Sequence, residues 1–245
     1  MTKLPGTDVE LALIAKGPGG FAPIFYEAPS TDAAMASVNA GNSGDLYVGG
    51  GGINGGFARA LAGQTLGTYE TRHKALVAQV RGGGEAHVVY EDENPTVFSL
   101  LNADRLLMDQ AQAHDGACFV DMFGPGLQPN GIAENAGMIY VASPFGGNFA
   151  TEELFIGAIR TLAETIALTA STYNGLQKPA DVRNLEVIRL CLYGSGIYNT
   201  HGTPAPDIAR AILQGLAQGL SSHAGGIGTI EIPDDDPWHL ALAGS

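Results

Sequence analysis

Asparagines and glycines dominate the stretch between Val38 and Phe57, which reads Val-Asn-Ala-Gly-Asn-Ser-Gly-Asp-Leu-Tyr-Val-Gly-Gly-Gly-Gly-Ile-Asn-Gly-Gly-Phe. The side chains of Asn39 and Asn42 can each donate and accept hydrogen bonds, as the hydroxyls of a sugar require. The glycines at 49–52 allow a close approach of the backbone, and N–H groups that precede a helix suit a phosphate. The stretch therefore predicts a cradle for a sugar phosphate.

A second stretch, Leu192–Asn199, reads Leu-Tyr-Gly-Ser-Gly-Ile-Tyr-Asn and precedes a helix predicted to begin at Pro206. It offers another set of backbone donors, together with the hydroxyl of Ser195 and the ring of Tyr198. Two loops suited to phosphate and one aromatic ring indicate a diphosphate with attached sugars.

The elements that must position these loops alternate along the chain. The strands we predict are Leu11–Ala15, Phe21–Tyr26, Ala34–Val38, His87–Tyr90, Val97–Leu101, Cys118–Met122, Met138–Ala142, Leu185–Leu192 and Gly228–Ile232. One predicted helix begins near Ile53, and three others span Asp104–His114, Thr151–Thr169 and Pro206–Leu220. Thr151 is the predicted N-cap of the third helix. Such alternation favours a sheet with helices on both faces, whose ligands bind outside the carboxyl ends of the strands.

The two stretches together resemble the signatures of the macrodomain family. The first is similar to Val-Asn-Ala-Ala-Asn followed by a glycine run and Val-Asp-Gly, and the second to Ser/Thr-Gly-Ile-Tyr-Gly. The resemblance covers roughly residues 8–63 and 138–235. It implies an α/β fold, a three-layer α/β/α sandwich with a mixed central sheet. We expect one macrodomain-like domain over residues 1–245, with an insertion within about 64–137.

The resemblance also implies a role for particular residues in binding ADP-ribose. Asn42 would contact the distal ribose, the glycine run and the second loop would contact the diphosphate, and Glu27, or else Asp32, would accept from the adenine amino group. The ligand-binding residues predicted in this way are Glu27, Asn39, Gly50, Gly51, Gly52, Ser195, Gly196, Ile197 and Tyr198.

Three departures from the family pattern bear on catalysis. Asn54 stands where the hydrolytic branch has the Asp that positions water, and an amide cannot act as a general base. The spacer after Asn42 is longer and carries Asp45, a carboxylate that could replace the missing one. Asn199, Thr200 and His201 follow Tyr198 where the family has glycine. The catalytic residues predicted are therefore Asn42, Asp45 and Asn54.

The charge and the apolar runs of the sequence limit the kinds of partner that we expect for this chain. The chain has 245 residues and a formal net charge of −13, and its Lys and Arg form no basic stripe, which argues against free nucleic acid as a partner. The apolar run near the N-terminus is too short for a signal peptide or membrane span, so a soluble, cytoplasmic protein is expected, with signal-independent export left open.

The histidines, cysteines and acidic residues outside these two stretches predict neither a bound metal nor a cofactor. No histidine has ligand-type spacing, and Asp234–Asp236 is interpreted as a solvated acidic terminus. Cys118 and Cys191 lie in apolar runs and are interpreted as small buried side chains. Residues 50–55 also match the Gly-x-Gly-x-x-Gly pattern, which keeps a Rossmann-type oxidoreductase as an alternative. No Gly-Lys-Ser/Thr follows a glycine run, so a P-loop is excluded.

The function predicted from the sequence is the binding of ADP-ribose and the hydrolysis of mono-ADP-ribose from a modified protein. A non-catalytic reader of ADP-ribose is the first alternative, favoured by Asn54. The expected partner is ADP-ribose or an ADP-ribosylated protein.

Overall fold

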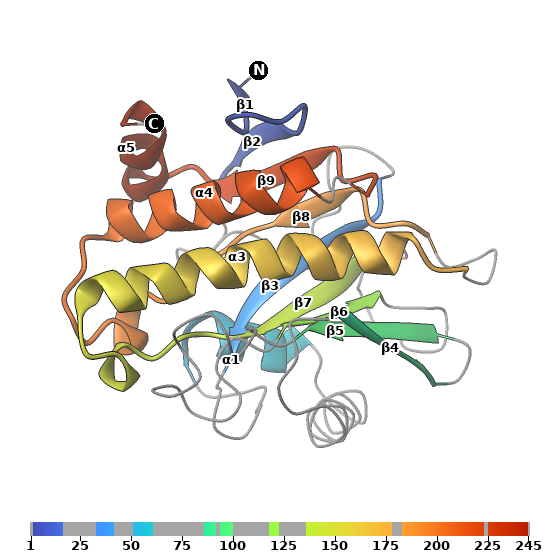
Figure 1. Cartoon of the computed structure of the whole chain (residues 1–245), viewed down its shortest axis with the longest axis horizontal. Helices are drawn as coiled ribbons and strands as arrows, with labels where there is room; N and C mark the ends of the chain where they lie inside the picture. The colour runs from blue at the N-terminus through green and yellow to red at the C-terminus, as the bar shows by residue number, and fades with distance from the viewer. Residues whose placement is uncertain are drawn as a thin grey trace.

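The computed structural model of the chain describes most of its carboxyl-terminal half and separate segments of its amino-terminal half (Figure 1). The described residues are 2–16, 33–41, 51–60, 86–91, 94–99, 118–122, 136–177, 183–222 and 225–244. The strand predicted at Phe21–Tyr26 and the helix predicted at Asp104–His114 lie outside them.

Nine strands of the described residues form one sheet in the order β1-β2-β9-β8-β3-β7-β6-β5-β4. The strands are β1 (Thr2–Lys3), β2 (Glu10–Ile14), β3 (Met35–Gly41), β4 (Ala86–Glu91), β5 (Asn94–Ser99), β6 (Cys118–Met122), β7 (Ala136–Ala142), β8 (Val187–Arg189) and β9 (Thr229–Pro233). The five neighbours from β2 to β7 run parallel, and the strands beyond them pair antiparallel. The sheet is therefore mixed, as predicted.

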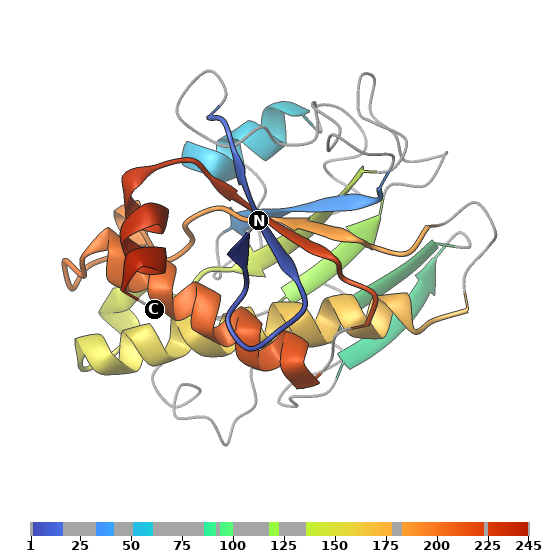
Figure 2. The same ribbon diagram turned by 90° about the horizontal axis from the view of Figure 1, so that it is seen from above.

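Helices cover both faces of this sheet (Figure 2). They are α1 (Gly52–Ala60), α3 (Glu152–Asn174), α4 (Ala205–Ser222) and α5 (Asp236–Ala243), with short 3-10 turns η1 (Gly146–Asn148) and η2 (Gly196–Tyr198). Seen from above, α1 lies on one side of the sheet and α3 and α4 lie on the other, while α5 packs beside α4. This arrangement is the predicted three-layer α/β/α sandwich.

The main hydrophobic core lies between the sheet and the pair α3 and α4. Val38 of β3 and Ile139 of β7 alternate with residues of the opposite face, as a buried strand requires, and join one cluster with Phe155 and Ile212. The predicted N-cap of α3 is confirmed, because the Thr151 hydroxyl oxygen accepts from the N–H of Leu154 at 3.3 Å. α3 is apolar and long enough to cross a membrane, yet more than half of its most apolar part is buried in the protein.

The face of the sheet that carries α1 is more polar. Arg189 and Glu231 form an ion pair there at 2.6 Å, with only 5% and 8% of their side chains exposed, and this pair joins β8 to β9. Ser37, which is paired in register with Arg189, is buried on the neighbouring strand. A buried polar row of this kind fixes the register of the strands, since a slip would leave a charge unpaired.

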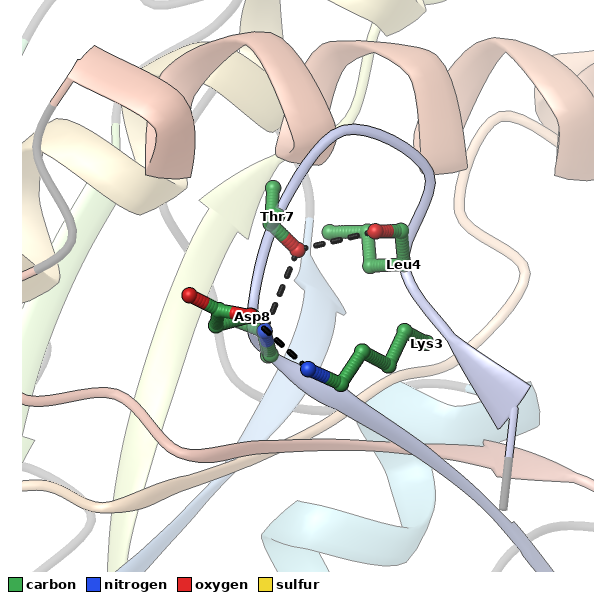
Figure 3. A network of polar contacts seen from close by, with 5 residues as sticks. Lys3, Leu4, Thr7 and Asp8 are labelled. Atoms are coloured by element: carbon green, nitrogen blue, oxygen red, sulfur yellow. Dashed lines mark hydrogen bonds and ion pairs between the residues drawn. The ribbon is translucent and has the colours of Figure 1, made fainter.

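The chain begins with a turn that joins β1 to β2 (Figure 3). The Thr7 hydroxyl donates to the carbonyl oxygen of Leu4 at 2.9 Å and accepts from the N–H of Val9 at 3.2 Å. Lys3 lies 2.8 Å from Asp8 and holds the pKa of that carboxyl below its ordinary value. Short-range hydrogen bonds therefore shape the turn.

The acidic run Asp234–Asp236 leads into the last helix of the described residues. Asp236 begins α5, whose Trp238 is fully buried, and Asp235 pairs with Lys16 at 3.0 Å. Asp234 lies 2.6 Å from His239. Asp234 and Asp236 are exposed, as a solvated acidic run requires, and the run also starts a helix that packs on α4.

Candidate ligand-binding site

Three parallel strands end at the same edge of the sheet and bring three loops together. β3 pairs with β7 on one side and with β8 on the other, so the carboxyl ends of all three strands face one way. The loops that follow contain the start of α1, residues 143–151 and residues 190–200. The carboxyl edge of central parallel strands is where ligands of α/β proteins bind.

The two stretches that carry the family resemblance meet directly at this edge. The Tyr198 hydroxyl donates a hydrogen bond to the carbonyl oxygen of Gly41, and the two oxygens lie 3.1 Å apart. The two residues are separated by 157 positions in the chain. The same carbonyl of Gly41 lies 3.4 Å from the N–H nitrogen of Ser143, so all three strand ends are linked.

Two exposed glycines with a left-handed backbone face this edge from different loops. Gly52, at the start of α1, and Gly196, in the second loop, both have φ of +60°. No other described residue lies within 4 Å of where a side chain would begin at either glycine. Because the first N–H groups of a helix have no partner within that helix, the backbone at Gly52 suits an anion.

Asn39 and Asn54, both predicted site residues, are joined at the end of β3. The side-chain nitrogen of Asn39 donates to the side-chain oxygen of Asn54 at 3.0 Å, and both residues are buried. The side-chain oxygen of Asn39 has no partner among the described residues. Asn54 is therefore held against the strand, and its amide cannot accept a proton from water as a carboxylate can.

The second loop presents the other predicted contacts. The Ser195 hydroxyl donates to the carbonyl oxygen of Leu192 at 2.5 Å, which leaves its oxygen able to accept only. The Ile197 side chain is 83% exposed, the largest exposure among the big apolar side chains of the described residues. The N–H groups of this loop, rather than its side chains, are thus the predicted donors to phosphate.

Four predicted site residues, Glu27, Asn42, Asp45 and Gly50, lie outside the described residues. Their roles at the adenine, the distal ribose, the attacking water and the diphosphate remain predictions. Gly51 is described and is exposed one residue before α1, where its carbonyl accepts from the N–H of Gly55 at 3.1 Å.

The loop at 143–151 also lies within the site, although no predicted site residue comes from it. Ser143 is fully buried, and its hydroxyl oxygen accepts from the N–H of Gly194 at 2.9 Å. His201, which follows the second loop, lies with its Nε2 3.2 Å from the carbonyl oxygen of Phe149. The available signal was the run Pro-Phe-Gly-Gly-Asn directly after a buried apolar strand at this edge.

Neither cysteine has the environment of an activated nucleophile. Both are free, and burial raises the pKa of the Cys118 thiol and of the Cys191 thiol to about 12. A thiol of this kind is almost entirely protonated at neutral pH and reacts slowly. The described residues contain no group of three or more His, Cys, Asp or Glu that could hold a metal ion.

Solved structures with similar folds are macrodomains. A mutant Oceanobacillus iheyensis macrodomain matches with a TM-score of 0.55 and 17% identity, over 99% of this chain and 94% of that one. The Trypanosoma brucei macrodomain in complex with ADP-ribose matches with a TM-score of 0.53 and 14% identity, over 98% and 72%. A second Oceanobacillus iheyensis mutant, with ADP-ribose, matches at 0.52 and 15%, over 87% and 84%. The chain therefore has the macrodomain fold, and its strand order differs from that of a Rossmann-type sheet.

Among curated proteins, the chain is similar to DNA/RNA-binding protein ALBA4 of Plasmodium falciparum, at 33% identity over 214 residues. The protein of the same name from Plasmodium yoelii yoelii is 32% identical over 217 residues. These alignments cover 81% and 82% of this chain but 56% and 57% of the relatives, so the chain spans about half of their length. No family model matches the chain.

Proposed function

We propose that this chain binds ADP-ribose at the shared edge of β3, β7 and β8. The observation that carries the proposal is the hydrogen bond from Tyr198 to Gly41, because it places the two loops suited to phosphate on either side of one strand end. Solved macrodomains of the same fold include complexes with ADP-ribose and with ADP. The diphosphate would lie between the start of α1 and the second loop.

The chemistry of the edge fits a ligand of modest charge. Residues 51–58, 143–151 and 190–206 contain no Lys, Arg, Asp or Glu. The N–H groups of Gly51, Gly52, Gly196 and Ile197 would therefore hold the diphosphate through backbone dipoles rather than ion pairs. Asn42 would orient the distal ribose and Glu27 would accept from the adenine amino group.

We propose an ADP-ribosylated protein as the natural partner, with the ADP-ribose end inserted at this edge. The finer proposal is that the chain also removes mono-ADP-ribose by hydrolysis, with Asn42 holding the ribose and Asp45 positioning the water. The hydrogen-bonded amide of Asn54 supports the alternative of a reader that binds without cleaving, since no carboxylate stands at that position.

Binding of free nucleic acid is the function named for the curated relatives, but we do not propose it for this part of such a protein. The matched part covers only 56% and 57% of these relatives, which therefore contain further residues. This chain carries a net charge of −13 and no basic stripe, whereas phosphate backbones are bound by clustered Lys and Arg.

The test is a calorimetric titration with ADP-ribose, beside an assay for its release from a mono-ADP-ribosylated protein. Wild type is compared with Asn42→Ala and Asp45→Ala, and Asp8→Ala serves as the control, because Asp8 is an exposed acid in the turn between β1 and β2. Binding with release that is lost in Asp45→Ala supports the hydrolase. Binding without release supports the reader, and no binding overturns the proposal.

A further inference from the structure

The loop between β7 and α3 packs against the second loop, Leu192–Asn199, and forms hydrogen bonds with it. Ser143, its first residue, accepts a hydrogen bond from the N–H of Gly194 at 2.9 Å and directs its own N–H at the carbonyl of Gly41, 3.4 Å away. Ser143 has no exposed surface. One buried serine thus contacts the strand end of the first stretch and the beginning of the second.

Gly146 lies against the far end of the second loop. A side chain at this position would begin 2.7 Å from the hydroxyl oxygen of Thr200 and 3.0 Å from the carbonyl oxygen of Tyr198. The first distance is shorter than real contacts of a Cβ atom and the second is tighter than most of them, so the backbone of Gly146 packs directly on the loop. A larger residue would force the Thr200 side chain or the loop backbone to shift.

A third contact continues the same support past Tyr198. Nε2 of His201 lies 3.2 Å from the carbonyl oxygen of Phe149, and the His201 ring lies 5.7 Å from the Phe155 ring. The second loop is therefore held by residues 143–155 from Gly194 to His201. Gly196 and Ile197, at the tip of this loop, stay exposed, as does Thr200.

We infer that Ser143 and Gly146 are positioning residues for the backbone donors of Gly196 and Ile197, and that they set the affinity for the diphosphate of ADP-ribose. They act through the second loop rather than by contact with the ligand. The inference rests on the proposed function for the identity of the ligand. Its physical basis is preorganisation, since donors fixed before binding cost less to order when the ligand arrives.

The experiment compares Ser143→Ala and Gly146→Ala with wild type by ADP-ribose calorimetry and by hydrogen exchange of the amides at 192–200 without ligand. Thr165→Ala is the matched control, because it also removes a hydroxyl hydrogen bond, at 2.9 Å, but within α3 and away from the loop. Ser143→Ala is expected to weaken binding about three- to tenfold and to speed exchange at Gly194. Thr165→Ala is expected to lose a similar amount of thermal stability but to leave both the ADP-ribose affinity and the exchange rate at Gly194 unchanged.

Two outcomes would overturn the inference: unchanged ADP-ribose affinity in both loop variants, or equal weakening in Thr165→Ala. If Ser143→Ala does not fold, Gly146→Ala gives the same comparison. If wild type does not bind ADP-ribose, the proposed function fails, while the exchange rates at 192–200 still test the positioning. Faster exchange there in both loop variants supports it, and unchanged exchange contradicts it.

Discussion

The side-chain nitrogen of Asn39 lies 3.0 Å from the side-chain oxygen of Asn54, and this bond joins the end of β3 to the first turn of α1. Both residues are buried, so the bond forms away from water. We expect Asn39→Ala to destabilise the protein by about 1–3 kcal/mol, because the oxygen of Asn54 then loses a donor in a buried place. Urea unfolding of Asn39→Ala, Asn54→Ala and the double variant measures the coupling. Strictly additive losses would show that the bond contributes nothing.

A carboxylate at position 54 would accept the same hydrogen bond from Asn39 and could also hold an attacking water. We therefore expect Asn54→Asp to leave ADP-ribose affinity within about threefold of wild type and to increase release of ADP-ribose from a modified protein at least about tenfold. Single-turnover release is the measurement. Asn148→Asp, which adds a carboxylate to the loop after β7, is the control. Equal release by wild type and Asn54→Asp would mean that a residue other than residue 54 positions the attacking water.

The sequence predicted those parts of the fold that depend on local pattern. Cys118–Met122 forms β6 with the expected bounds, and Thr151 begins α3 as a capping side chain. The Leu185–Leu192 strand is shorter than expected, since only Val187–Arg189 keeps strand pairing. Beyond it, Leu190 donates to the carbonyl of Glu231, and the chain then turns into the second loop.

The candidate site was predictable only as far as its two signature stretches. The residue types do not predict the hydrogen bond from the N–H of Gly194 to Ser143. This bond joins residues 51 positions apart and forms only because β7 and β8 flank β3. The close approach of the Tyr140 ring to the position where a side chain of residue 41 would begin likewise depends on the tertiary structure. The pairing of Asn39 with Asn54 required the position of α1 relative to the sheet, which no local periodicity provides.

Gly41 stands where the resemblance expects alanine, and the structure gives the reason. A side chain there would clash with the ring of Tyr140, which is fully buried on the neighbouring strand. We expect Gly41→Ala to destabilise the protein by about 1–3 kcal/mol. Tyr140→Leu should cost stability alone, yet lessen the cost of Gly41→Ala in the double variant. A thermal-unfolding cycle checks this, and an equal cost of Gly41→Ala in both backgrounds would contradict it.

The buried thiol of Cys118 predicts a loss of stability at alkaline pH. Burial raises its pKa from 9.0 to about 12, so the folded protein keeps the proton that the unfolded chain releases. The stabilising contribution is complete below pH 9.0 and is lost as the pH rises toward 12, at about 1.4 kcal/mol per pH unit. Urea midpoints at about pH 8 and about pH 10 measure the slope. Cys118→Ala should lower this slope without abolishing it, because the pKa of the Cys191 thiol is also raised to about 12, and an unchanged slope would assign it to other groups.

The absence of charged side chains from residues 51–58, 143–151 and 190–206 predicts how salt affects binding. Backbone donors release no counterions, so the affinity for ADP-ribose should change by less than about twofold between low and moderate salt. Calorimetry across a salt series checks this, with a single-stranded oligonucleotide as the comparison ligand. A steep salt dependence for ADP-ribose would mean that Lys or Arg from elsewhere in the chain reaches the phosphates. Tight, salt-sensitive binding of the oligonucleotide would instead assign the nucleic-acid binding of the curated relatives to this part of the protein.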